Sequence, residues 1–315
     1  MSDPCRLILD VDTGIDDAMA ILYALNRPGI RLEACTTTFG NTDVDTATGN
    51  TLRILELAGR GDVPVARGAA RSLVRPFVKA ADHVHGPNGL GGVSLPEPRA
   101  KPFGEDASDL IIRMARENPG AITLCPVGPQ TNVAVALSRA PEIATLLKEI
   151  VVMGSTIFHP GIQGIPTPMA DANFWNDAEA AQIVVRSGAK VTLVGLDVTM
   201  KMLLTKPMRE EIAAGGPIGA TMMKIAEFYV NSYATMYPGI AGCGLHDPLA
   251  VAIAEDRSLA TIERLCIDIE LAGTLTRGQT VADRRRSAAG RENADVCLGV
   301  DGERFNKRFV AALRG

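Results

Sequence analysis

The stretch CRLILDVDTGIDDA, residues 5–18, decides the fold. Residues 5–11 are a short apolar run typical of a buried parallel strand, and a helical pattern begins at residue 16. Gly14 supplies the turn between the two elements. Because ligands of open α/β sheets bind at the carboxyl ends of the strands, this turn predicts a site at that edge of the sheet.

Four carboxylates crowd this turn: Asp10, Asp12, Asp16 and Asp17. Acids this close repel one another and raise their own pKa values unless a cation or strong donors compensate. An oxygen-only set of ligands favours calcium or magnesium over zinc. Helix and strand capping is the alternative explanation, but it accounts for only two of the four acids.

Two known motifs begin with closely spaced aspartates, as this turn does. A calcium-binding EF-hand is excluded, because its Asp or Asn, its Gly and its Glu are replaced by Gly14, Ile15 and Ile21. A haloacid-dehalogenase-like phosphohydrolase would use Asp10 as nucleophile beside magnesium, but it expects Thr or Val where Gly14 stands. It remains the alternative enzymatic interpretation.

Strand-like and helical patterns alternate along the chain. This order predicts an α/β fold with an open, mostly parallel, Rossmann-like sheet flanked by helices. The length of 315 residues suits one large domain or two small ones. The Gly- and Pro-rich stretch 60–104 is expected to be a functional excursion rather than a linker. Strands are predicted at 5–11, 30–38, 121–125, 148–153, 190–195, 264–272 and 294–299, and helices at 16–26, 43–59, 130–139, 177–186, 206–237, 247–254 and 301–314.

The composition narrows the class of partner. The chain has 32 basic and 36 acidic residues among 315, so no broad basic surface is available for nucleic acid or anionic lipid. A small-molecule ligand is therefore expected. The opening residues lack the pattern of a secretion signal, and no apolar run approaches the roughly 18 residues of a membrane span. We expect a cytoplasmic protein that does not enter a membrane.

Two later motifs follow predicted strands or open helices. LCPVGPQTN, residues 124–132, offers backbone carbonyls that suit calcium and would face the acid cluster. CGLHDPLA, residues 243–250, places His246 beside Asp247 at the start of a helix. An ordinary helix cap explains Asp247 as well as a metal ligand does.

Taken in order, these motifs resemble the nucleoside hydrolases of the inosine-uridine preferring type. The resemblance spans nearly the whole chain and implies a single domain, residues 1–315. The opening DVDTGIDDA combined with the late HDP is its most specific part. The other matching segments are TTTFGN (36–41), HVHG (83–86), VGPQTN (127–132), VVMG (151–154), ADANFWNDAEAA (170–181) and VGLDVT (194–199).

The resemblance implies an enzyme that hydrolyses the N-glycosidic bond of ribonucleosides to free base and ribose. Ca²⁺ would be bound by Asp12, Asp17, Asp247 and the main-chain carbonyl of Val127, with water and two ribose hydroxyls completing its shell. Asp12 would also act as general base on the metal-bound water. His246 would be the general acid that protonates the departing base.

The resemblance also implies substrate contacts and a homodimer or homotetramer. Asp16, Asn41 and Asn173 would bind the ribose hydroxyls, which favours ribosides over 2′-deoxyribosides. His85 would contact the base or the 5′ side. Tyr233 lies in a stripe with Tyr229 and Tyr237, spaced by four residues, that is either a core face or a surface that stacks on the base and feeds its protonation.

Two departures from the family pattern concern the ribose 5′-hydroxyl. Asp171 replaces a Glu and Ile165 replaces an Asn, and the family uses both of those side chains to hold this hydroxyl. Asp171 is still expected to contact the substrate, with a weaker or different grip, and Gln163 is a candidate to supply the missing amide. The departures also leave a catalytically weakened ribose-binding homologue as an alternative.

Overall fold

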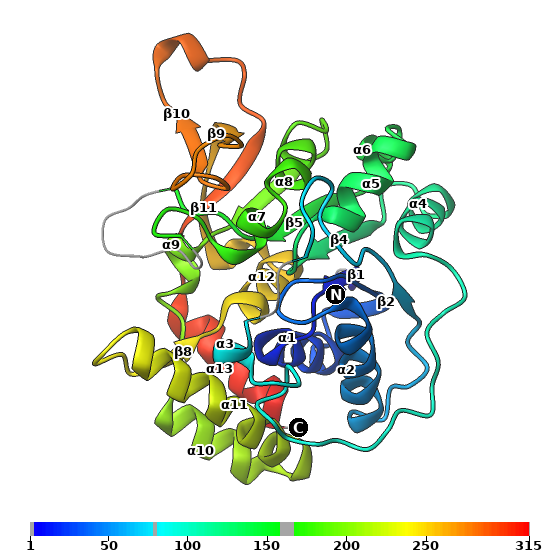
Figure 1. Cartoon of the computed structure of the whole chain (residues 1–315), viewed down its shortest axis with the longest axis vertical. Helices are drawn as coiled ribbons and strands as arrows, with labels where there is room; N and C mark the ends of the chain where they lie inside the picture. The colour runs from blue at the N-terminus through cyan, green and yellow to red at the C-terminus, as the bar shows by residue number, and fades with distance from the viewer. Residues whose placement is uncertain (1–2, 78–80, 158–166, 315) are drawn as a thin grey trace.

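The computed structural model describes residues 3–77, 81–157 and 167–314, and its centre is a nine-stranded sheet (Figure 1). The strand order is β10-β9-β11-β6-β5-β4-β1-β2-β3. All neighbours from β11 to β3 are parallel, whereas β9 is antiparallel to β10 and β11. The strands are β1 (Cys5–Val11), β2 (Ile30–Thr37), β3 (Val65–Arg67), β4 (Ile122–Pro126), β5 (Glu149–Met153), β6 (Val191–Val194), β9 (Ala260–Ile269), β10 (Thr280–Asp283) and β11 (Ala294–Val300); β7 (Leu203–Thr205) and β8 (Gly242–Gly244) form a separate antiparallel pair.

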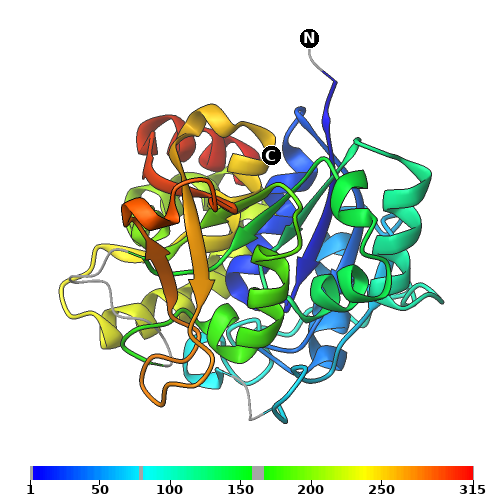
Figure 2. The same cartoon turned by 90° about the horizontal axis from the view of Figure 1, so that it is seen from above.

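Helices cover both faces of the sheet (Figure 2). One face packs against α1 (Ile15–Asn26), α2 (Val44–Leu57) and α12 (His246–Glu255). On the same side, α11 (Pro217–Met236) and α13 (Gly302–Arg314) pack against α1, and α10 (Lys206–Gly215) packs against α11 and α13. The other face packs against α4 (Ala107–Glu117), α5 (Thr131–Arg139), α6 (Ile143–Leu146) and α8 (Ala178–Val185). Three further short helices are α3 (Asp82–His85), α7 (Ala172–Asn176) and α9 (Leu196–Thr199).

The middle of strand β1, residues 7–9, is apolar because both of its faces are buried. Leu7, Leu9 and Val11 belong to the core on the α1 side, and Ile8 belongs to the core on the α5 side. Successive side chains of a strand point to opposite faces, so a strand between two helical layers needs apolar residues at every position.

The order of the strands places a crevice beside β1. From β1 the chain moves outward to β2 and β3 and then returns to β4 on the other side of β1. The strand order therefore reverses between β1 and β4, whose carboxyl ends lie at Val11 and Pro126. Such a reversal is where ligands of open α/β sheets bind, and it is where the aspartates follow β1.

The predicted α/β fold with a mostly parallel sheet is confirmed, and the details differ where local signals were short. The helical pattern at 206–237 is two helices, α10 and α11, separated at Gly216. Strand β9 begins earlier than predicted and pairs with β10, which was not predicted. The excursion 60–104 contains β3 and α3, each too short to produce a periodic pattern.

Helix α4 was also missed, although its sequence carries a signal. Leu110, Ile111, Met114 and Ala115 are buried along one side of it. In the described part of the chain, no helix is long and apolar enough to span a bilayer.

Candidate active site

The turn after β1 is held by one of its own carboxylates. Asp17 Oδ1 accepts a hydrogen bond from the backbone N–H of Asp12 at 3.1 Å, and Oδ2 accepts one from Gly14 N–H at 2.9 Å. Asp17 thus satisfies free donors at the start of α1, as an acid in a first helical turn commonly does. The capping interpretation is correct for this residue, but it leaves the other acids unexplained.

Asn41, in the loop after β2, links Asp12 to Asp17. Its backbone N–H donates to Asp12 Oδ2 at 2.6 Å, and its side-chain Nδ2 donates to Asp17 Oδ2 at 3.0 Å and to Asp12 Oδ1 at 3.3 Å. These bonds hold the two carboxylates side by side although both are buried.

A third and a fourth carboxylate complete the cluster. Carboxylate oxygens of Asp16, Asp17 and Asp247 all lie within 4.8 Å of one another, with Asp247 brought in by the first turn of α12. Burial and the charge of Asp17 raise the pKa of Asp12 well above its usual range, and the same causes raise the pKa of Asp16 to about 8. Burial and the charge of Asp16 likewise raise the pKa of Asp247 strongly.

This cluster has the chemistry of a cation site. Asp16 Oδ1 is buried and has no hydrogen-bond partner among the described residues. Burial, and the charge of neighbouring acids, raise the pKa values of Asp12, Asp16 and Asp247, and a bound cation would favour their ionised forms. The ligand atoms on offer are hard oxygens, which suits calcium or magnesium.

The predicted backbone ligand lies at the same edge of the sheet. The carbonyl of Val127 follows β4 and accepts a hydrogen bond from Asn173 Nδ2 at 2.6 Å. Asn173 Nδ2 also lies 3.2 Å from the carbonyl oxygen of Met153, at the end of β5. One amide group therefore joins the ends of two neighbouring strands at the cavity.

Four side chains form a hydrogen-bonded series that runs from α1 to α12. The Tyr229 hydroxyl donates to Asp16 Oδ2 at 3.2 Å and lies 3.3 Å from the Tyr233 hydroxyl. The Tyr233 hydroxyl lies 2.5 Å from His246 Nε2. All four side chains are buried, and burial lowers the pKa of His246 to about 4, so its imidazole is neutral at physiological pH.

His85 is held by the first amide of α1. The backbone N–H of Ile15 donates to His85 Nδ1 at 3.1 Å, and the ring stacks on Tyr229 with centroids 5.3 Å apart. A backbone N–H only donates, so Nδ1 carries no proton, and the neutral ring has its proton on Nε2. Burial lowers the pKa of His85 to about 3, which keeps this form at neutral pH.

Most of these residues line a cavity that is partly open to solvent, with an empty volume of about 620 Å³ including that open part. Asp12 and Asp17 do not line it, although both hydrogen-bond Asn41, which does. The predicted site residues that line it are Asp16, Asn41, His85, Val127, Asp171, Asn173, Tyr233, His246 and Asp247. The apolar lining residues Val84, Met153, Leu196 and Met200 were not predicted, because nothing in their sequence context separates them from core residues.

Asp171 lies at the cavity, but its carboxylate is already occupied. It is the N-cap of α7, and Oδ1 accepts hydrogen bonds from the backbone N–H groups of Asn173 and Phe174. Oδ2 accepts a hydrogen bond from Ser155 N–H. Ile165 and Gln163, the other residues predicted to bear on the 5′-hydroxyl, lie outside the described residues.

Asp10 is buried behind the site and does not line the cavity. Its Oδ1 accepts hydrogen bonds from Thr36 and Asn132, at 2.6 and 2.8 Å. A nucleophile must reach the substrate, so this position does not support the phosphohydrolase interpretation.

The chain is similar to known proteins over nearly its whole length. A family model described as inosine-uridine preferring nucleoside hydrolase matches residues 7–307. The pyrimidine-specific ribonucleoside hydrolase RihA of Salmonella arizonae is 39% identical over 309 residues, which cover 98% of both chains.

Solved structures give the same result. The purine-preferring ribonucleoside hydrolase from Gardnerella vaginalis is 37% identical, with a TM-score of 0.93 and coverage of 98% of both chains. A plant nucleoside hydrolase is 33% identical, with a TM-score of 0.94 and coverage of 99% of both chains. Sequence and fold together, over nearly the whole length, show that this chain belongs to the family of inosine-uridine preferring nucleoside hydrolases, enzymes that hydrolyse the N-glycosidic bond of ribonucleosides.

Proposed function

We propose that the protein is a calcium-dependent ribonucleoside hydrolase in which Asp12 is the general base and His246, together with Tyr233, supplies the proton to the departing base. The observation that carries this proposal is the buried group of carboxylates beside a cavity that Tyr229, Tyr233 and His246 also line.

Asp12, Asp17, Asp247 and the carbonyl of Val127 would hold the ion, which leaves Asp16 for the sugar. Asp16 lines the cavity, and its Oδ1 has a free lone pair that suits a ribose hydroxyl. When bound, the ion acts as a Lewis acid that makes water acidic enough to lose a proton near neutral pH.

In the reaction, water loses a proton to Asp12 and its oxygen bonds to C1′ of the ribose. The bond from C1′ to the base nitrogen breaks, and its electron pair leaves with the base. Positive charge develops on the sugar ring on the way, and the neighbouring carboxylates stabilise it. The base takes a proton from the His246–Tyr233 pair, which solvent restores.

The cavity also suits a nucleobase. Val84, Leu196 and Met200 provide apolar surface, and the tyrosines provide aromatic faces for a flat ring. RihA of Salmonella arizonae is named pyrimidine-specific and the Gardnerella enzyme purine-preferring, at 39% and 37% identity, so the test substrates include both classes.

The test is release of reducing sugar from uridine, cytidine, inosine and adenosine by the pure protein. We expect hydrolysis of at least one substrate, loss of it in a calcium chelator, and recovery when calcium is added in excess. Hydrolysis that is unchanged by thorough chelation would contradict the metal dependence. If none of the four nucleosides is hydrolysed, the enzymatic proposal is wrong.

Two isosteric variants separate the roles of the acids. Asp12→Asn should lose calcium binding by calorimetry and at least about a thousandfold in kcat, because it removes both a ligand and the base. Asp16→Asn should bind calcium within a few-fold of the parent and lose mainly the preference for ribosides over 2′-deoxyribosides. The reverse pattern would assign the metal to Asp16 instead of Asp12.

A further inference from the structure

The proposed reaction leaves one buried hydroxyl at the acid unused. Thr199, the last residue of α9, is fully buried, and its Oγ1 lies 2.7 Å from His246 Nδ1. We infer that Thr199 is a positioning residue that donates its proton to Nδ1 and so fixes His246 with an N–H on Nε2, facing Tyr233. This inference rests on the proposed role of His246.

The direction of each hydrogen bond follows from the carboxylate end of the series. The Tyr229 hydroxyl donates to Asp16 Oδ2, and a hydroxyl has a single proton, so Tyr229 has none left for its contact with Tyr233. At the contact between the two tyrosines, Tyr233 must then be the donor.

The same count of donor protons applies to His246. Tyr233 has spent its only proton on Tyr229, so at its contact with His246 the donor is the Nε2–H of the ring. A neutral imidazole has one N–H, so Nδ1 is an acceptor. The hydroxyl of Thr199 is therefore the donor at Nδ1, and it sets the direction of the whole series from its far end.

Thr199 is on an element that is itself fixed. The backbone N–H of Leu196, the first residue of α9, donates to the carbonyl of Ser155 at 3.0 Å, and Asp197 Oδ2 accepts from Ile157 N–H at 2.9 Å. These bonds tie α9 to the segment that follows β5, so the hydroxyl approaches the imidazole from a defined direction.

Without this hydroxyl, the buried Nδ1 would lose its partner and the ring could adopt the other tautomer. The N–H on the cavity side would then be lost from part of the population. The rate of hydrolysis should fall for a substrate whose leaving group must be protonated. It should not fall for a substrate whose leaving group departs without protonation.

The experiment compares Thr199→Val, which keeps the shape of the side chain, with Thr199→Ser, which keeps the hydroxyl. Both are assayed as the calcium-loaded full chain on the best nucleoside and on p-nitrophenyl β-D-ribofuranoside, whose leaving group needs no proton. Thr199→Val should lose about tenfold or more in kcat on the nucleoside, with little change in KM, and stay within about threefold on the nitrophenyl riboside. Thr199→Ser should remain within about threefold of the parent on both.

A second readout does not depend on activity. The chain has four histidines, so ¹⁵N-histidine labelling gives a small set of signals, and His246→Gln assigns those of His246. The parent should show an unprotonated Nδ1 and a protonated Nε2, and the Nδ1 signal should move in Thr199→Val.

Three results would overturn the inference: a protonated Nδ1 in the parent, equal losses on both substrates in Thr199→Val, or no loss on the nucleoside. A parent that is inactive on every nucleoside contradicts the proposed function instead, and the ¹⁵N signals then decide the Thr199 contact by themselves.

Discussion

The carboxylate of Asp171 is at the cavity but is not free for a substrate. Its two oxygens accept three backbone N–H groups, from Ser155, Asn173 and Phe174. Burial still raises its pKa to about 6. Ser155 has a φ of +92°, in a region that non-glycine residues rarely adopt, so Asp171 helps to hold a strained backbone beside the site. A side chain committed in this way has little capacity left for a ribose hydroxyl.

We therefore predict that the enzyme tolerates loss of the ribose 5′-hydroxyl. For whichever of uridine or inosine is the better substrate, kcat/KM should fall by less than about a hundredfold in its 5′-deoxy analogue, because no buried polar group is left unpaired. The 2′-deoxy analogue should fall further, since Asp16 would lose a hydroxyl partner. A preference of more than a hundredfold for the 5′-hydroxyl would show that another residue grips it.

At the scale of elements, the segment that carries His85 is docked on α11 through a glycine. Gly91 has a φ of +62°, and a Cβ at this position would lie 2.6 Å from the carbonyl oxygen of Ile225 and 2.9 Å from the Cβ of Phe228. The neighbouring Gly92 has a φ of +75°, but a Cβ there would meet no atom within 4 Å. The two glycines thus differ in contact with α11 and not in backbone conformation.

Gly91→Ala and Gly92→Ala form a matched pair that tests this docking. Each should cost about 1 kcal/mol of unfolding free energy for the left-handed backbone alone. Gly91→Ala should cost about 1–3 kcal/mol more and lower kcat/KM, because the clash with α11 moves His85. Urea unfolding and nucleoside hydrolysis measure the two effects. Equal behaviour of the two variants would mean that the segment is not positioned through Gly91.

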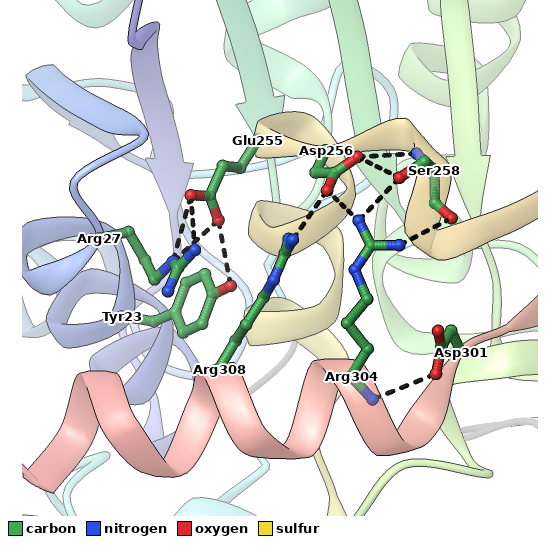
Figure 3. Close-up of polar contacts among 8 residues, drawn as sticks. All are labelled: Tyr23, Arg27, Glu255, Asp256, Ser258, Asp301, Arg304 and Arg308. Atoms are coloured by element: carbon green, nitrogen blue, oxygen red, sulfur yellow. Dashed lines mark hydrogen bonds and ion pairs between the residues drawn. The ribbon is translucent and has the colours of Figure 1, made fainter. Parts of the chain in front are cut away.

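The two helices that bring carboxylates to the site are joined at their other ends. Arg27, which follows α1, pairs with Glu255 at the end of α12 at 2.9 Å, and the Tyr23 hydroxyl lies 3.3 Å from the same carboxylate (Figure 3). Next to this pair, Arg304 and Arg308 of α13 bind Asp256. This network lies at the end of α12 opposite to Asp247.

We predict that Glu255→Gln lowers stability without changing catalysis. Arg27 and Glu255 are mostly buried, so loss of one charge should cost about 2 kcal/mol of unfolding free energy. The ten residues of α12 span about 15 Å, so Glu255 lies far from the site at the other end of the helix. The kcat/KM of Glu255→Gln should therefore stay within about threefold of the parent value. The control is Glu97→Gln, at an ion pair with Arg53 in which Glu97 is 86% exposed, which should cost less than about 0.5 kcal/mol. Similar losses of unfolding free energy in both variants would mean that the Arg27–Glu255 pair contributes no more than an exposed ion pair.

At the scale of the whole molecule, local pattern predicted most of the strands and helices, the family resemblance predicted residues that line the cavity, and the contacts that hold those residues were not predicted. The apolar runs gave β1, β4 and β5, and the rule for parallel sheets placed their carboxyl ends together. The contact of Thr199 with His246 joins residues 47 positions apart, and no periodicity reports it. The commitment of Asp171 to three amides depends in part on how the segment after β5 returns to the site, which is also a tertiary property.

The crowding of buried acids also predicts how the stability of the whole chain depends on pH. Burial raises the pKa of Asp10 to about 7, and burial with the charge of Asp17 raises the pKa of Asp16 to about 8, against an ordinary value of 3.8. At pH values between 3.8 and these raised pKa values, the folded state binds more protons than the unfolded state, so the free energy of unfolding falls as pH rises. His85 and His246, whose pKa values are lowered by burial, act in the opposite sense, mainly below their ordinary value of 6.5.

In a comparison of pH 6.5 with pH 8.5, the acids therefore dominate the pH dependence of stability. We predict that the metal-free protein, prepared with a chelator, loses about 2 kcal/mol of stability between these two pH values, seen as a Tm lower by several degrees at pH 8.5. Calcium should raise the Tm more at pH 8.5 than at pH 6.5, because the ion binds ionised carboxylates and protons compete with it. In Asp16→Asn, which removes one of the titrating groups and keeps the shape of the side chain, the pH dependence of the metal-free protein should be smaller. A Tm that rises from pH 6.5 to 8.5 in the absence of metal would mean that donors, and not a cation, already compensate the acids at the end of β1.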